Sequence, residues 1–220
     1  RDDGSTAGLS SGPTTSHAVQ SDTLAQRMQV AGYHTVKVGK AHFGAIGTPG
    51  ADPCNLGFDV NIAGHAAGAP SSYLAKRSFL RKPSDKIWQP PGLSAYHGQD
   101  RFLTDVLTDE AINEVEAAHS RDEPFFLYLA HYAVHTPLDP DNRFVKQYRL
   151  AGLPEPEARY AALVEGMDHS LGRLLDWLDQ KGLEEETIVV FTSDNGGLSA
   201  HARSGAKHTH NSPLKSGKGS

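Results

Sequence analysis

The fold prediction starts from one stretch near the C-terminal end of the sequence, Thr187-Ile188-Val189-Val190-Phe191-Thr192-Ser193-Asp194-Asn195-Gly196-Gly197. Its first six residues are β-branched or apolar, which predicts a strand covered on both faces of a sheet. Such a strand carries the acid and amide that follow it to the carboxyl edge of the sheet, where open α/β proteins bind ligands. Asp194 and Asn195 offer adjacent oxygen donors suited to Ca²⁺ or Mg²⁺. Because Asp, Asn and Gly also favour turns, the stretch alone leaves a turn and a metal site equally open.

The composition is that of an ordinary globular chain. The 220 residues are 38% hydrophobic and 21% charged, which suits one domain or a large part of one. A net charge of −5 without a Lys/Arg run argues against a generic nucleic-acid surface, and no apolar run is long enough to span a membrane. The single cysteine, Cys54, excludes an internal disulfide framework, and we expect it to be a buried small hydrophobic residue. The sequence begins at Arg1 rather than Met, and we interpret it as a fragment.

Periodicity along the chain predicts three helices that alternate with three strands. The helices are expected from an N-cap at Asp22 to a stop at Gly32, from Asp100 through Val115, and from near Pro156 to Gly182. The strands are expected at Tyr33–Val38, Pro124–Ala130 and Thr187–Thr192. Residues 1–20 are predicted to be loop and residues 45–99 a long irregular insertion. The alternation implies an incomplete α/β fold, with a mainly parallel central sheet and helices on both faces, in which residues 1–220 form part of a single domain.

Polar residues follow each predicted strand at its carboxyl end. They are Lys40 and His42, His131 and His135, and Asp194 and Asn195. Parallel strands would bring these groups to the same edge of the sheet, which predicts an active site there. A cation flanked by lysine and imidazole suits a multiply charged oxyanion ester, and histidine can move a proton to the leaving oxygen. Taken singly, each residue is open to a plainer interpretation, as a solvated lysine or a hydrogen-bonded structural histidine, and we assign His131 to the structural class.

Three further histidines, His201, His208 and His210, lie in one loop without any recognised zinc-ligand spacing. We expect this loop to lie near a substrate, with a solvated loop as the alternative.

Five motifs in order resemble those of type I (formylglycine-dependent), arylsulfatase-like sulfatases in the alkaline phosphatase superfamily. Residues 32–44 resemble the signature GYxTxxxGKWHLG, with Ala41 in the usual place of tryptophan. The later motifs are Gly57-Phe58-Asp59, His135-Thr136-Pro137, Thr192–Gly197 and Asn211–Gly219. Each motif is only suggestive alone, whereas the ordered set is highly specific and covers the chain from Asp22 onward.

The resemblance implies a role for each matching residue. Asp194 and Asn195 would be ligands of one Ca²⁺ ion, and Lys40 and Lys218 would contact the sulfate oxygens. His135 would lie beside the sulfate and the leaving oxygen, and Lys218 would help to protonate that oxygen. His42 would contact the formylglycine nucleophile and assist the release of sulfate. His210 is expected to contact the substrate.

Two parts of the family pattern do not occur in this sequence. They are the C/S-x-P/A-x-R motif, whose Cys or Ser becomes formylglycine, and the early aspartate pair of the calcium site; we interpret Asp2 and Asp3 as loop residues. We therefore expect a parent sulfatase, in which residues 1–220 are part of the catalytic domain, and a chain that is inactive and binds Ca²⁺ weakly by itself.

The resemblance implies hydrolysis of a sulfate ester to an alcohol and inorganic sulfate. The alternatives are a phosphoester or phosphonate-ester hydrolase of the same superfamily and a non-catalytic metal-binding homologue that recognises sulfated glycans. We expect a sulfated small molecule or carbohydrate as substrate, no nucleic-acid partner, no transmembrane segment, and export to the periplasm, the extracellular space or the lysosome.

Overall fold

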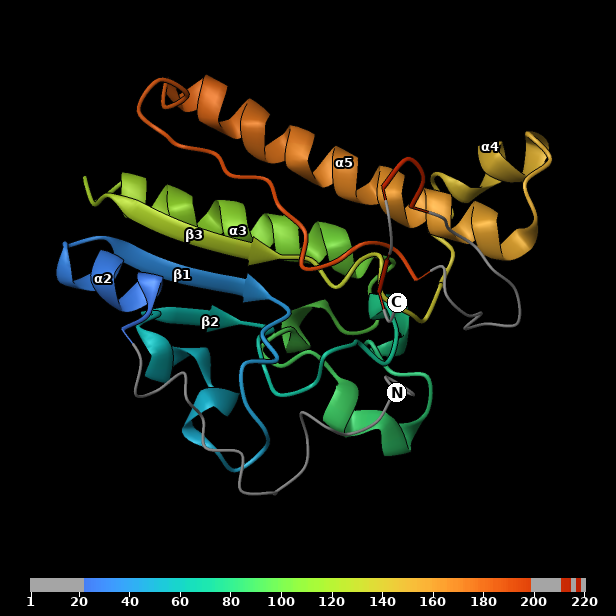
Figure 1. The fold of residues 1–220 in the computed structure, drawn as a ribbon, viewed down its shortest axis with the longest axis horizontal. Coiled ribbons are helices and arrows are strands. Elements are labelled where there is room, and N and C mark those ends of the chain that lie inside the picture. The colour runs from blue at the N-terminus through green and yellow to red at the C-terminus, as the bar shows by residue number, and fades with distance from the viewer. Residues whose placement is uncertain (1–21, 199–210, 215–216, 219–220) are drawn as a thin grey trace. The chain divides into compact units, whose positions relative to one another are not determined.

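The computed structural model describes residues 22–198, 211–214 and 217–218 (Figure 1). These residues divide into two compact units: the first unit extends up to Tyr132 and the second begins at Ala133. Each unit has its own architecture. No helix among the described residues is both long and apolar enough to cross a membrane.

The first unit is built on a parallel three-stranded sheet. Strand β1 (His34–Gly39) lies in the middle, between β2 (Val60–Ile62) and β3 (Phe125–Ala130), in the order β2-β1-β3. Helix α3 (Leu103–His119) packs along β1 and β3, and α2 (Leu24–Val30) packs against β1 (Figure 1). The α/β fold with a parallel sheet is therefore confirmed.

Both helices of this unit begin later than the sequence pattern predicts. The N-cap of α2 is Thr23 rather than Asp22, because the Thr23 side chain accepts a hydrogen bond from the Gln26 amide while the Gln26 side chain accepts one from the Thr23 amide. Helix α3 begins at Leu103 rather than near Asp100. Its apolar face is buried as predicted, with Leu103 and Val115 fully inaccessible to solvent.

The predicted insertion at residues 45–99 contains more structure than expected. It holds β2, which the sequence analysis missed because a strand of three residues is too short to show a periodicity of two. It also holds five short 3₁₀ helices, which are η2 (Pro49–Ala51), η3 (Pro53–Leu56), η4 (Ala75–Arg77), η5 (Pro83–Trp88) and η6 (Ser94–Tyr96). The assignment of residues 1–220 to one domain stays a prediction.

Cys54 is exposed, so the prediction of a buried cysteine is wrong. The side chain of Asp52 accepts a hydrogen bond from the Cys54 amide and starts η3, which turns Pro53 and Leu56 inward and leaves Cys54 outside. Partial desolvation and the neighbouring Asp52 carboxylate raise the pKa of the Cys54 thiol.

Two helices form the core of the second unit. Helix α4 (Val145–Leu150) was not predicted, and it packs against α5 (Glu155–Lys181) around buried Val145, Ala158 and Ala162. Helix α5 confirms the predicted long helix and ends at Gly182, whose φ of +66° gives the left-handed C-terminal residue for which glycine is favoured.

The predicted strand at Thr187–Thr192 is absent from the structure. The segment has no strand assignment, and Ile188 and Phe191 are 91% and 71% exposed. A strand is held by hydrogen bonds to a neighbouring strand, and no strand among the described residues pairs with this segment. Its apolar sequence is typical of a strand, but a strand forms only where a neighbouring strand pairs with it.

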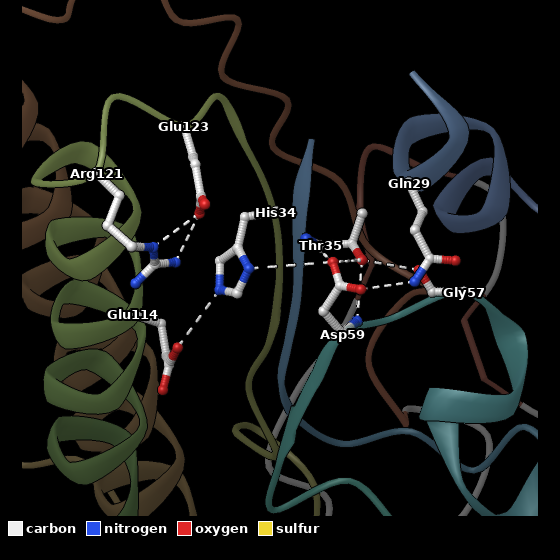
Figure 2. A network of polar contacts seen from close by, with 8 residues as sticks. All are labelled: Gln29, His34, Thr35, Gly57, Asp59, Glu114, Arg121 and Glu123. Atoms are coloured by element: carbon white, nitrogen blue, oxygen red, sulfur yellow. Dashed lines mark hydrogen bonds and ion pairs between the residues drawn. The ribbon is translucent and has the colours of Figure 1, made fainter. Parts of the chain in front are cut away.

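A polar network fixes the amino edge of the sheet (Figure 2). The Asp59 carboxylate accepts hydrogen bonds from the Thr35 amide at 2.9 Å and from Gln29 Nε2 at 2.6 Å, which ties α2 to β1 and to the start of β2. His34 Nε2 lies 3.6 Å from a carboxylate oxygen of Glu114 on α3. Partial desolvation opposes ionisation of Asp59, but the hydrogen bonds from Thr35 and Gln29 outweigh it and lower the pKa of this carboxyl group.

Candidate active site

The turn after β1 positions the first predicted site residues. The Lys40 amide donates to the Ala130 carbonyl at 2.8 Å and so extends the pairing of β1 with β3 by one residue. Gly39 has a φ of +89°, and a Cβ atom there would collide with the same carbonyl oxygen, so the turn requires glycine. Ala41 then points inward, with only 8% of its surface exposed, while His42 is exposed. Lys40 and His42 are thus presented at the carboxyl edge of the sheet.

A segment that the sequence analysis did not single out supports His42. The His42 amide donates to the His65 carbonyl at 3.0 Å. The φ of His42 is +58°, a left-handed conformation that a non-glycine residue keeps only where its surroundings hold it. Gly68 lies against the imidazole, and a Cβ atom at Gly68 would be 2.7 Å from His42 Nδ1. The only sequence signal for this support is the pair of small residues Gly64 and Gly68 around a histidine.

Two further titratable groups are Lys37, which lies inside the sheet, and His131, which follows the end of β3. Lys37 on β1 is completely buried, its Nζ donates to the Val38 carbonyl at 3.1 Å, and it lies 5.0 Å from the centre of the Tyr128 ring. Burial lowers the pKa of Lys37 to about 7. His131 is partly buried with its Nδ1 enclosed by protein, and burial, together with the charge of Lys37, lowers its pKa to about 4. The structural interpretation of His131 stays a prediction.

His135 lies at the start of the second unit. Its Nδ1 is 2.8 Å from the Thr136 carbonyl oxygen, and since a carbonyl only accepts, Nδ1 carries the proton of the neutral ring. Nε2 is then the nitrogen with a lone pair. Arg159 on α5 reaches the Leu138 carbonyl at 3.5 Å, and this contact connects the loop after His135 to the helical core.

The loop that carries Asp194 and Asn195 is closely packed against the last described residues. Asn211 forms two hydrogen bonds of 2.9 Å with the backbone of Gly197, one in each direction. The Lys218 amide donates to the Gly196 carbonyl at 3.2 Å. A Cβ atom at Gly196 would lie 2.6 Å from Asn211 Oδ1, so this close approach requires glycine. The structure thus brings the Asp194–Asn195 loop and Lys218 together.

The donors of this loop have the chemistry that a hard cation requires. Asp194 is exposed, and Asn195 Nδ2 donates to the Gly196 carbonyl at 2.9 Å, which leaves Asn195 Oδ1 as an acceptor. Both are oxygen ligands of the kind that Ca²⁺ prefers, although Ca²⁺ takes about six to eight oxygens. No cluster of three or more His, Cys, Asp or Glu side chains suited to a metal occurs among the described residues.

The predicted site residues therefore fall into two groups, one in each unit. Lys40 and His42 are brought together in the first unit, and the Asp194–Asn195 loop and Lys218 in the second. His210, with His201 and His208, lies outside the described residues, as do Asp2 and Asp3.

The first unit is an α/β fold with Lys40 and His42 at the carboxyl edge of its sheet, and the second unit carries the Asp194–Asn195 loop and Lys218. Residues 5–216 match the family model described as Sulfatase, so the chain belongs to the sulfatase family.

Several relatives are similar over most of the chain. It is 28% identical to a sulfatase of Formosa agariphila, over 90% of this chain and 41% of that protein. It is 33% identical to the uncharacterized sulfatase YdeN of Escherichia coli K12, over 80% of this chain and 33% of that protein. It is 31% identical to N-acetylgalactosamine-6-sulfatase of Mus musculus, over 79% of this chain and 32% of that protein. The chain thus spans less than half the length of these relatives.

A solved structure shares the fold. The crystal structure of Ps i-CgsB in complex with k-i-k-neocarrahexaose has a TM-score of 0.74 and 29% identity, and the match covers 92% of this chain and 45% of that one. The PsFucS1 sulfatase from Pseudoalteromonas sp., with a TM-score of 0.58 and 23% identity over 86% of this chain and 41% of that one, shares the fold alone.

Proposed function

We propose that the protein hydrolyses sulfate esters to an alcohol and inorganic sulfate. The observation that carries this proposal is the match to the sulfatase family over residues 5–216, which contains Lys40, His42 and His135; Lys218 follows two residues after the matched range. Sulfate-ester cleavage needs cations around the sulfate oxygens and an acid for the leaving oxygen, and these residue types supply both.

We assign the roles as follows. Lys40 and Lys218 bind the sulfate oxygens and stabilise the charge that develops as the ester bond breaks. His135 lies beside the leaving oxygen, and since its Nδ1–H is directed to the Thr136 carbonyl, Nε2 is the nitrogen that exchanges a proton with that oxygen. Lys218 assists this protonation. His42 acts in the second half of the reaction, in which sulfate leaves a formylglycine nucleophile.

We assign Asp194 and Asn195 as ligands of one Ca²⁺ ion. A bound divalent cation would neutralise charge on the sulfate oxygens. The oxygen donors support a hard cation, and the two residues supply part of the ligand set that such an ion requires.

We propose a sulfated carbohydrate as the substrate class, with residues 45–99 and the loop of His201 and His210 shaping its pocket. Two similar proteins support this choice: one is named N-acetylgalactosamine-6-sulfatase, and another was solved with k-i-k-neocarrahexaose. We also propose that the protein is exported, because calcium is abundant outside the cytoplasm.

The decisive experiment compares matched substrates. The product of the complete gene is assayed on 4-nitrophenyl sulfate and 4-nitrophenyl phosphate, with Lys40→Ala and His135→Ala as site variants and Lys76→Ala, an exposed lysine of η4, as control. We expect faster turnover of the sulfate and a loss of at least about 100-fold in kcat/KM in both site variants. Faster turnover of the phosphate would favour a phosphoester hydrolase instead. No turnover of either ester, together with a complete gene that lacks C/S-x-P/A-x-R, would favour a non-catalytic glycan-binding homologue.

A further inference from the structure

A second histidine, His65, contacts His42 in the first unit. We propose that His65 and Tyr132 are positioning residues for His42, an inference that rests on the proposed sulfate-ester hydrolysis. Neither residue carries a role in the assignments above, and neither belongs to the motifs that the sequence resembles.

Direct contacts connect His65 to His42. The His65 carbonyl accepts the His42 amide at 3.0 Å and so holds the backbone of His42 in its left-handed conformation. The backbone three residues further on, at Gly68, lies against the His42 ring and leaves no room for a side chain. The segment from His65 to Gly68 therefore restrains both the backbone and the imidazole of His42.

Tyr132 in turn fixes His65. The Tyr132 hydroxyl donates its proton to the Ala63 carbonyl at 2.8 Å, and the hydroxyl oxygen lies 3.1 Å from His65 Nδ1. The Tyr132 hydroxyl and the backbone of Ala63 and Ile87 thus surround the His65 ring with polar contacts that fix its position. Tyr132 is buried and follows β3 by two residues, so it belongs to the rigid end of the sheet. Tyr132, just after β3, therefore holds His65, and His65 in turn holds His42.

The charge state of His65 also suits this role. Burial lowers the pKa of His65 to about 4, and the charge of His42 acts in the same direction. The titratable groups that face it are His42, from the turn after β1, and Tyr132, whose pKa burial raises. His65 is therefore neutral at neutral pH, and it restrains His42 without adding positive charge beside it.

The test uses three variants of the product of the complete gene: His65→Leu, Tyr132→Phe and His65→Asn. We expect His65→Leu and Tyr132→Phe to lower kcat on 4-nitrophenyl sulfate by at least about tenfold and to lower KM with it, so that kcat/KM changes little, because a small displacement of a reacting group is costly and the affected step follows the first release of product. Since His42 is assigned to sulfate release, the first turnover should still give a burst of 4-nitrophenol. In His65→Asn the side-chain amide keeps a polar group that can hydrogen-bond to Tyr132, so kcat should stay within about threefold of the wild type.

The activity of His65→Asn distinguishes a loss of positioning from a loss of folding, because a variant that failed to fold would lose activity whichever residue replaced His65. The control is His119→Asn, at the end of α3 and at the opposite edge of the sheet, which should keep wild-type kcat. Wild-type kcat in His65→Leu, or equal losses in His65→Asn and His65→Leu, would overturn the inference.

A second measurement decides the inference even if the wild-type protein hydrolyses no sulfate ester, a result that would refute only the proposed function. Long-range ¹H–¹⁵N spectra of the histidine rings in the 220-residue chain should show a neutral His65 ring at neutral pH. Tyr132→Phe should shift the ring signals of His42 and leave those of His119 unchanged. Unchanged His42 signals in Tyr132→Phe would overturn the positioning role.

Discussion

Replacement of Lys37 by methionine should stabilise the protein, most strongly at neutral and acidic pH. Lys37 is completely buried in β1, and burial lowers its pKa from 10.5 to about 7. Methionine has a similar length and no charge to desolvate. At about 1.4 kcal/mol for each pKa unit, this lowering corresponds to about 5 kcal/mol of free energy of unfolding.

The sign follows from the protons bound in each state. In the unfolded chain Lys37 regains its ordinary pKa of 10.5, so between pH 7 and pH 10.5 the unfolded state binds more protons than the folded state. The free energy of unfolding therefore rises with pH across this window. Below about pH 7 both states are protonated, and the cost of the buried charge is fully present and constant.

Two favourable contacts of Lys37 offset part of the gain. Its hydrogen bond to the Val38 carbonyl and its position near the Tyr128 ring are lost in Lys37→Met, at a cost of about 1–2 kcal/mol. We therefore expect Lys37→Met to be about 3–4 kcal/mol more stable than the wild type at pH 6 and nearly equal to it at pH 10.

The assay is urea unfolding of both proteins, followed by circular dichroism at pH values from 6 to 10. The difference between wild type and variant cancels the titration of groups that Lys37 does not affect, and His131, whose pKa Lys37 helps to lower to about 4, titrates below the range of the assay. Lys76→Met on the exposed η4 helix is the matched control. A difference between wild type and Lys37→Met that does not change with pH would show that the amine keeps an ordinary pKa in the folded protein, and would refute the reasoning.

Three further predictions concern other described residues. In the wild type, the free energy of unfolding should fall as the pH is lowered from 6.5 to about 4, because the pKa of His131 is about 4 in the folded state and 6.5 in the unfolded state, which therefore binds an extra proton in this window. His131→Asn should make this fall smaller by about 1.4 kcal/mol per pH unit, as measured by urea unfolding at several pH values. Asp59→Ala should lower the free energy of unfolding by about 1–3 kcal/mol, because Thr35 and Gln29 lose their acceptor; an equal loss in the exposed control Asp22→Ala would contradict this. Asp194→Ala in the product of the complete gene should weaken Ca²⁺ binding, measured by calorimetry, by at least about tenfold, and an unchanged affinity would show that Asp194 is not a ligand.

The sequence predicted the elements whose signals are local. The long apolar repeat and the closing Gly182 located α5, and the apolar runs located β1 and β3 to within a residue. The starts of α2 and α3 were misplaced by one and three residues, because Thr23 rather than its neighbour Asp22 caps α2, and α3 begins after Phe102 without any side-chain cap.

The elements that depend on distant partners could not be predicted in the same way. Strand β2 has three residues and exists through its pairing with β1, so its own sequence carries almost no signal. Thr187–Thr192 is the opposite case, since its sequence has a strong strand signal and no strand pairs with it in the described part of the chain. Local pattern and pairing are separate conditions for a strand, and each of these segments meets only one of them.

The parts of the candidate site that the sequence predicted are those where a close approach of two backbone segments requires glycine. Gly39 and Gly196 both occupy positions where a side chain would collide with a neighbouring segment, and each adjoins a predicted functional pair, Lys40 with His42 and Asp194 with Asn195. The glycines of these motifs are therefore required by a close approach of backbone segments, and a single sequence can show them.

His65 and Tyr132 were not predicted, for the converse reason. Their importance comes from contacts with residues 23 and 69 positions away along the chain, which no local pattern encodes. The residues assigned to the site thus adjoin glycines that the sequence itself shows, whereas the contacts of His65 and Tyr132 become visible only in the fold.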